Sequence, residues 1–220
     1  MISHVIFDCD GVLIDSENIS MAVDMSLLAQ NGIVLTEAEM YRRFVGPTFE
    51  DMVAELEREH RKTLPPDLSA RKDGMMLELY RRDLKPVTGV IPMLQNLAIP
   101  KSIGTNGPRN RALEALRLTG LAPFFGERLT TFEDVTNPKP APDIYQLAAK
   151  RAGLAPAHCL VVEDSVTGAT AALAAGCTVI GFTGVAHDPV AKARELKALG
   201  VSHVIHEMGE LLGAISPIAA

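Results

Sequence analysis

From residue 86 onward, short apolar runs alternate with segments in which apolar residues recur at helical spacing. The apolar runs predict strands at residues 101–105, 159–162, 178–182 and 202–205. The amphipathic segments predict helices at residues 109–119, 143–152, 166–175 and 189–199. Strands that alternate with helices are typical of a parallel sheet covered on both faces. We therefore expect an α/β fold with a doubly wound sheet.

The amino-terminal run Val5-Ile6-Phe7 predicts one further buried strand, which ends at Asp8. A lone strand would leave its backbone N–H and C=O groups without partners, so this strand should join the same sheet. The pattern between residues 16 and 83 is helical instead, and no convincing strand interrupts it. The sheet-forming core should therefore contain an inserted helical segment.

The inserted segment begins with apolar residues at helical spacing, Ile19, Val23 and Leu27, and Gly32 closes this first helix. Further helices are predicted at residues 37–44, 49–60 and 68–82. We predict a core domain formed by residues 1–14 and 86–220, and an all-helical domain formed by residues 15–85.

The composition of the chain limits which partners and which cellular location are expected. The chain has 220 residues, of which 47% are hydrophobic and 22% charged, and its formal net charge is -6. This charge opposes nucleic-acid binding. The start has no basic region, and no apolar run reaches the roughly 18 residues of a membrane span. Cys9, Cys159 and Cys177 form no paired motif, so reduced thiols and a cytoplasmic location are expected.

Polar residues follow several of the predicted strands or lie in the loops that lead into the helices. They are Asp8 and Asp10, Thr105-Asn106-Gly107, Lys139, and Glu163 with Asp164. The carboxyl ends of parallel strands meet at one edge of a sheet, where ligands bind. Carboxylates crowded at such an edge repel one another unless a cation lies among them. Oxygen ligands favour Mg²⁺, so we expect a magnesium site.

Each of these residues also has an ordinary structural interpretation. Asp164 or Ser165 could cap the helix that follows. The segment 105–108 could be only a turn, and Lys139 could be a solvated turn residue between prolines. These interpretations would have to coincide at successive strand ends, which favours a shared site.

The same residues resemble the four motifs of the haloacid dehalogenase superfamily. Asp8-Cys9-Asp10-Gly11-Val12-Leu13-Ile14-Asp15-Ser16 is similar to the first motif, and Thr105 with Asn106-Gly107 to the second. Lys139 in Pro138-Lys139-Pro140 is similar to the third motif, and Val162-Glu163-Asp164-Ser165 to the fourth. The order is that of the family, and sugar-phosphate phosphatases and β-phosphoglucomutases are the nearest groups. The resemblance implies a Rossmann-like core with a helical cap.

The resemblance also implies roles for these residues. Asp8 would attack phosphorus and form an aspartyl-phosphate, and Asp10 would act as general acid and base. Lys139 and Thr105 would stabilise charge on the phosphoryl oxygens, with Asn106 and Gly107 as substrate-binding residues. Mg²⁺ would be held by Asp8, Asp10 and Asp164, with Glu163 helping directly or through water.

The cap implied by the resemblance should select the substrate. Val45, Gly46, Thr48 and Phe49 are the candidates to face the leaving group. The positions that carry a histidine and an arginine in the mutases carry Ser20 and Phe49 here. We therefore predict a phosphatase of a small phosphorylated metabolite, with a phosphosugar mutase or a non-catalytic binding module as alternatives.

The metabolite could be a sugar phosphate or resemble phosphogluconate or phosphoglycolate. We expect a monomer or a weak homodimer with no nucleic-acid or membrane partner. Asp10 argues against a dehalogenase, since dehalogenases of the superfamily do not use a second aspartate as acid–base at that position.

Overall fold

The computed structural model describes residues 1–44, 48–201 and 203–219. The chain divides into two compact units. One unit combines Met1–Asp15 with Lys85–Ala220, and the other consists of Ser16–Leu84. We call them the sheet unit and the helical unit. Among the described residues, no helix has the length and apolar character needed to cross a membrane.

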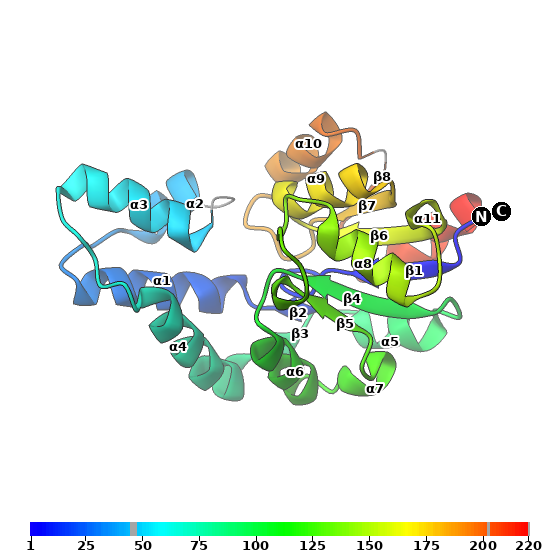
Figure 1. The fold of residues 1–220 in the computed structure, drawn as a ribbon, viewed down its shortest axis with the longest axis horizontal. Helices are drawn as coiled ribbons and strands as arrows, with labels where there is room; N and C mark the ends of the chain where they lie inside the picture. The colour runs from blue at the N-terminus through cyan, green and yellow to red at the C-terminus, as the bar shows by residue number, and fades with distance from the viewer. Residues whose placement is uncertain (45–47, 202, 220) are drawn as a thin grey trace. The chain divides into compact units, whose positions relative to one another are not determined.

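A six-stranded sheet forms the centre of the sheet unit (Figure 1). Its strands are β1 (His4–Phe7), β4 (Lys101–Thr105), β5 (Leu129–Thr131), β6 (Cys159–Glu163), β7 (Thr178–Phe182) and β8 (His203–Ile205). Their order across the sheet is β5-β4-β1-β6-β7-β8, and every neighbouring pair is parallel. The predicted parallel sheet is therefore confirmed. The apolar pattern does not predict β5, because this strand is short and mostly threonine.

Strand β1 lies between β4 and β6, so the chain leaves it in one direction and later returns on its other side. In parallel sheets, such a reversal opens a crevice at the carboxyl ends of the strands. The residues that follow β1, β4 and β6 are therefore brought next to one another by the strand order alone.

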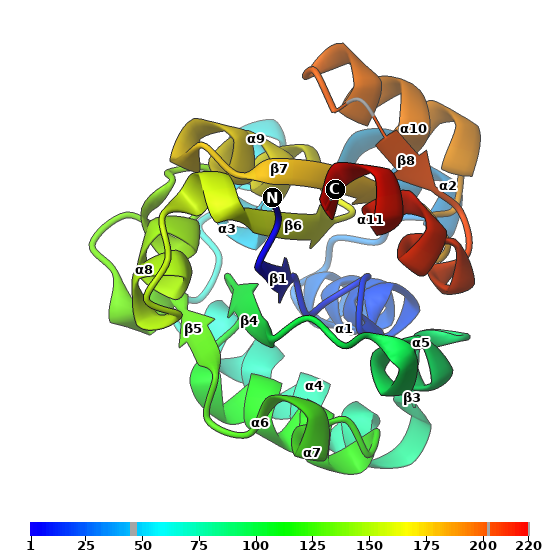
Figure 2. The same ribbon diagram turned by 90° about the vertical axis from the view of Figure 1, so that its right-hand side faces the viewer.

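Helices cover both faces of the sheet. On one face, Ile6 and Val161 pack in a cluster with Ala148, Ala172 and Leu196 of three helices. On the other face, the Phe7 ring meets the Phe125 ring edge-on, with their centroids 6.1 Å apart. Figure 2 shows α8 and α9 on one side of the sheet and α5 and α11 on the other. Strands buried on both faces are mostly apolar, as residues 5–7 of β1 and 159–162 of β6 are.

The helices of the sheet unit are α5 (Val90–Asn96), α6 (Arg109–Leu118), α7 (Ala122–Phe125), α8 (Asp143–Arg151), α9 (Val166–Ala175), α10 (Pro189–Ala198) and α11 (Leu211–Ala219). The four predicted helices correspond to α6, α8, α9 and α10, within a residue or two at their ends. The apolar pattern does not predict α5, α7 and α11. A second, antiparallel pair joins β2 (Ile14–Asp15) to β3 (Lys85–Pro86). This pair brings together the two points where the chain leaves the sheet unit and re-enters it, so the helical unit is an insertion.

The helical unit consists of α1 (Glu17–Gln30), α2 (Glu37–Phe44), α3 (Phe49–His60) and α4 (Leu68–Asp83). The predicted all-helical character of this segment is confirmed. Leu27 of α1 and Tyr80 of α4 lie in its apolar interior. An ion pair of 2.8 Å between Asp24 and Lys72 joins α1 to α4, and both side chains are largely buried.

Asp134 joins the edge strand β5 to two helices of the sheet unit. Its carboxylate accepts hydrogen bonds from the Thr131 N–H and from the guanidinium groups of Arg109 and Arg151. Burial would raise the pKa of Asp134, but Arg151 and the Thr131 N–H outweigh this and lower the pKa to about 2.

We expect Asp134→Asn to lower the free energy of unfolding by about 1 kcal/mol at pH 7, after allowance for solvent screening of the partly exposed arginines. The folded pKa lies below the ordinary value, so this contribution is present above pH 4. It disappears as the pH falls toward 2. Urea unfolding of both proteins at pH 7 and pH 3 checks this, and a gap that widens in acid would contradict it.

Candidate active site

Asp8 is the first residue after β1, and the sheet fixes its position. Its backbone N–H donates to the Val162 carbonyl oxygen at 3.0 Å, which continues the pairing with β6. Its side chain is buried. The chain then turns at Gly11, where φ is +77° and a Cβ atom would overlap the Asp164 carboxylate. Glycine at this position therefore allows the loop after Asp8 to approach the end of the neighbouring strand.

Lys139 enters the same space from the loop before α8. Its side chain is buried, and its Nζ donates to Oδ1 of Asp8 at 2.6 Å and to Oε1 of Glu163 at 2.7 Å. This contradicts the alternative of a solvated turn lysine. The Asn106 side chain accepts a hydrogen bond from the Lys139 N–H at 3.0 Å and donates to the Lys139 carbonyl oxygen at 3.1 Å. Asn106 therefore fixes the backbone of the loop that carries the lysine.

Thr105 ends β4 and is buried. Its Oγ1 accepts a hydrogen bond from the Gly107 N–H at 2.9 Å. A Cβ atom on Gly107 would lie 3.4 Å from Oδ2 of Asp10 and 3.3 Å from Nη2 of Arg111. The second motif therefore lies beside the half-buried Asp10. Arg111, at the start of α6, is a further cation near the site.

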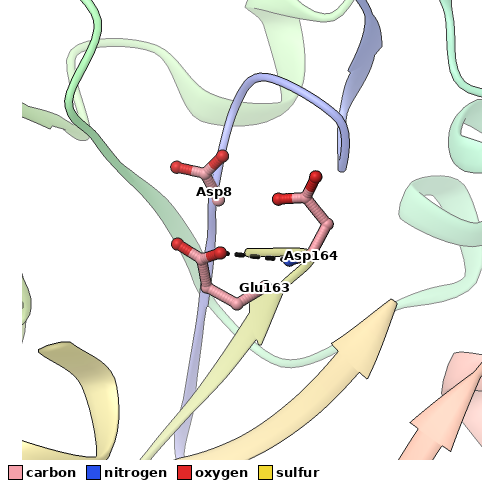
Figure 3. A group of neighbouring side chains, drawn as sticks. All are labelled: Asp8, Glu163 and Asp164. Atoms are coloured by element: carbon pink, nitrogen blue, oxygen red, sulfur yellow. Dashed lines mark hydrogen bonds between the residues drawn. The ribbon is translucent and has the colours of Figure 1, made fainter. Parts of the chain in front are cut away.

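Three carboxylates meet at the ends of β1 and β6. Figure 3 shows the side chains of Asp8, Glu163 and Asp164 gathered around a common space. Each offers an oxygen atom, and these atoms all lie within 4.8 Å of one another. These three residues, which the sequence pattern predicts to share a site, therefore lie together although they come from distant parts of the chain.

Burial and the neighbouring charges shift the pKa values of the groups in this cluster. Burial raises the pKa of Asp8 to about 7; Lys139 opposes the rise, and Glu163 and Asp10 add to it. Burial would lower the pKa of Lys139, but Asp8 and Glu163 raise it, so the lysine stays charged. One ammonium group faces several carboxylates, and the donors are all oxygens. This donor set fits Mg²⁺, which prefers carboxylate ligands.

The residues predicted to face the leaving group belong to the helical unit, and the described ones among them make contacts within that unit. Val45 and Gly46 lie outside the described residues. The Thr48 side chain caps α3, because its Oγ1 accepts from the Asp51 N–H at 3.1 Å and donates to the Asp51 carboxylate at 2.8 Å. The Phe49 ring packs under Lys72, whose Nζ is 4.5 Å from the ring centroid. Their role toward a substrate stays a prediction.

The sequence pattern does not identify Tyr145 and Ser165 as site residues, but both bind Glu163. The Tyr145 hydroxyl donates to Oε1 of Glu163 at 2.7 Å, and Ser165 donates to Oε2 of the same carboxylate through both its N–H and its hydroxyl. Tyr145 belongs to the buried face of an amphipathic helix, where an aromatic residue is usually a core residue. The one related sequence signal is Gly104 in β4, because a Cβ atom there would lie 3.2 Å from the Tyr145 ring.

Gly168 gives a test of how firmly Glu163 is held. A Cβ atom on Gly168 of α9 would overlap the Glu163 carboxylate, which is fully buried. We expect Gly168→Ala to displace this carboxylate, to lower the free energy of unfolding by about 2 kcal/mol or more, and to reduce activity.

The matched control is Gly74→Ala in α4, where an added Cβ atom meets nothing within 4 Å. This change should stabilise the protein by about 0.5–1 kcal/mol, because alanine is the better helix residue. Thermal unfolding of both variants measures the contrast. Equal stability of the two variants would show that Glu163 adjusts freely.

Comparison with known proteins agrees with this geometry. Residues 5–182 match the model of the family described as haloacid dehalogenase-like hydrolase. The chain belongs to this family, so the predicted resemblance is confirmed. It is 28% identical over 188 residues to a 6-phosphogluconate phosphatase of Escherichia coli (strain K12), covering 85% of each chain.

Two further relatives extend the comparison. A phosphorylated carbohydrates phosphatase of Thermotoga maritima is 31% identical over 188 residues, which cover 84% of this chain and 85% of the relative. The crystal structure of a conserved haloacid dehalogenase-like protein of unknown function from Agrobacterium tumefaciens has a TM-score of 0.89 and 35% identity, and covers 100% of both chains. The similarity therefore includes both units of the chain.

Proposed function

We propose that this protein is a magnesium-dependent phosphatase that hydrolyses a small phosphorylated metabolite through an aspartyl-phosphate on Asp8. The observation that carries the proposal is the buried Lys139 ammonium, 2.6 Å from Asp8 and next to the acidic cluster of Asp8, Glu163 and Asp164. The general class of the activity follows from the family. The chain is a phosphoric monoester hydrolase of the haloacid dehalogenase family.

The first half of the proposed reaction moves the phosphoryl group to the protein. An oxygen of Asp8 forms a bond to phosphorus while the bond from phosphorus to the leaving oxygen breaks. Asp10 gives its proton to that oxygen, so the metabolite leaves as an alcohol. Lys139 and Thr105 stabilise the negative charge on the phosphoryl oxygens during the transfer.

The second half releases phosphate. Asp10, now deprotonated, takes a proton from a water molecule whose oxygen attacks phosphorus, and the bond between Asp8 and phosphorus breaks. Asp8, the backbone carbonyl of Asp10 and Asp164 would hold Mg²⁺, with Glu163 as a further candidate. The ion would offset the repulsion between the anionic phosphate and the Asp8 carboxylate.

Two positions of the helical unit support hydrolysis over the mutase alternative. The positions that carry a histidine and an arginine in the mutases carry Ser20 and Phe49 here. At the second of these positions, phenylalanine cannot supply the cation that would bind a second phosphate group.

Phosphate release from a panel of sugar, sugar-acid and small organic-acid phosphates tests the proposal. Each compound is assayed with Mg²⁺ and again with excess chelator. We expect release that depends on Mg²⁺. Conversion of a sugar 1-phosphate to its 6-phosphate faster than phosphate release would favour the mutase. No turnover of any kind by the folded protein would favour a binding module.

A further inference from the structure

Every hydrogen-bonding position of the Glu163 carboxylate is occupied by the protein. Oε1 accepts from Lys139 Nζ and from the Tyr145 hydroxyl, both at 2.7 Å. Oε2 accepts from the Asp164 N–H at 3.0 Å, the Ser165 N–H at 3.1 Å and the Ser165 hydroxyl at 3.0 Å. A carboxylate has about four lone-pair sites. A metal ion could therefore reach Glu163 only by displacing one of these donors.

Tyr145 is positioned to hold both Glu163 and Lys139. It lies on α8, the helix that follows the lysine loop, and its side chain is completely buried. Its ring centroid is 4.6 Å from Lys139 Nζ, so the ammonium group packs against the ring face while the hydroxyl binds Glu163. Gly104 leaves room for this ring on β4. The ammonium is thus fixed by Asp8, Glu163 and the Tyr145 ring.

We propose that Tyr145 is a positioning residue that acts through Glu163 to fix the Lys139 ammonium against Asp8, and that Glu163 serves the lysine and is not a metal ligand. This inference rests on the proposed function, in which Lys139 stabilises the transferring phosphoryl group. The ammonium group has three N–H donors. Two of them are directed to Asp8 and Glu163, which leaves the third to bind a phosphoryl oxygen.

The test uses Tyr145→Phe, which removes the hydroxyl and keeps the ring. We expect kcat to fall about tenfold with little change in KM, as is usual when a partner that orients a functional group is lost. The Mg²⁺ dissociation constant, measured by calorimetry, should stay within about twofold of the wild-type value, because no ligand is disturbed. Tyr80→Phe is the control, since it removes another buried tyrosine hydroxyl from the helical unit; its kcat should not change.

A double variant shows whether Tyr145 acts through Glu163. Tyr145→Phe combined with Glu163→Gln should have the kcat of Glu163→Gln alone, because the two residues belong to one chain of contacts. Independent, multiplying losses would overturn the proposal, and so would an unchanged kcat in Tyr145→Phe. A Mg²⁺ dissociation constant raised tenfold or more in Tyr145→Phe would assign Glu163 to the metal instead.

A failure of the inference about Tyr145 can be distinguished from a failure of the proposed phosphatase function. If the wild-type protein releases no phosphate from any compound, the proposed function fails. The melting temperatures of the wild type, Tyr145→Phe, Glu163→Gln and the double variant, together with the calorimetric titrations, still report on the network. Non-additive shifts in melting temperature would then support the contact between Tyr145 and Glu163, and additive shifts would contradict it.

Discussion

Asp8→Asn is expected to lower kcat for phosphate release by about 10⁴-fold or more while the protein remains folded. The amide has nearly the shape of the carboxylate but carries no negative charge, so it cannot form the bond to phosphorus. Its oxygen can still accept the hydrogen bond that Lys139 gives to Oδ1 of Asp8. Single-turnover and steady-state assays with the best substrate of the panel measure the loss.

The thermal stability of Asp8→Asn shows whether the inactive variant is still folded. The pKa of Asp8 in the folded protein is raised to about 7 by burial, above its ordinary value of 3.8. The metal-free wild-type protein therefore loses stability as the pH rises from 4 to 7, whereas Asp8→Asn does not. Without Mg²⁺, the variant should melt at the higher temperature at pH 8, and the difference should shrink toward pH 4. A variant that is inactive because it is unfolded would show the opposite.

The sequence allows the order and type of the main elements to be predicted because the apolar pattern is strong there. Strands β1, β4 and β6 are buried on both faces, and their apolar runs end at polar residues that the parallel order must bring together. Strand β5 and the pair β2 and β3 are too short to carry a pattern. Their positions depend on pairing with distant segments, which no local signal contains.

The site was predictable in its charged residues and not in the contacts that hold them. Asp8, Lys139 and Glu163 could be identified because several motifs coincide with strand ends. That Asn106 binds the backbone of Lys139 depends on where two loops meet in space. The hydroxyl of Tyr145 donates to Glu163 on strand β6. The apolar pattern of the helix that carries Tyr145 indicates only that this side chain is buried.

Lys139→Met should have the second large effect, and it should affect stability as well as rate. The methionine has a similar length but leaves the buried Asp8 and Glu163 without their cation. Removing one partner of a buried ion pair typically costs about 3–5 kcal/mol, so the metal-free variant should unfold at much lower urea concentration at pH 8. Loss of a cation that stabilises the phosphoryl oxygens should lower kcat by about 10³-fold.

Lys101→Met is the matched control, because Lys101 begins the strand β4 and, within the described part of the chain, its Nζ donates to the carbonyl oxygens of Leu94 and Leu97. No carboxylate loses its cation in this control, so it should retain kcat and most of its stability. Mg²⁺ should stabilise Lys139→Met more than it stabilises Lys101→Met, since the ion would supply positive charge that Asp8 has lost. Equal stabilisation of the two variants would mean that the metal does not approach the carboxylate that Lys139 neutralises, and the assignment of Asp8 as a metal ligand would then be wrong.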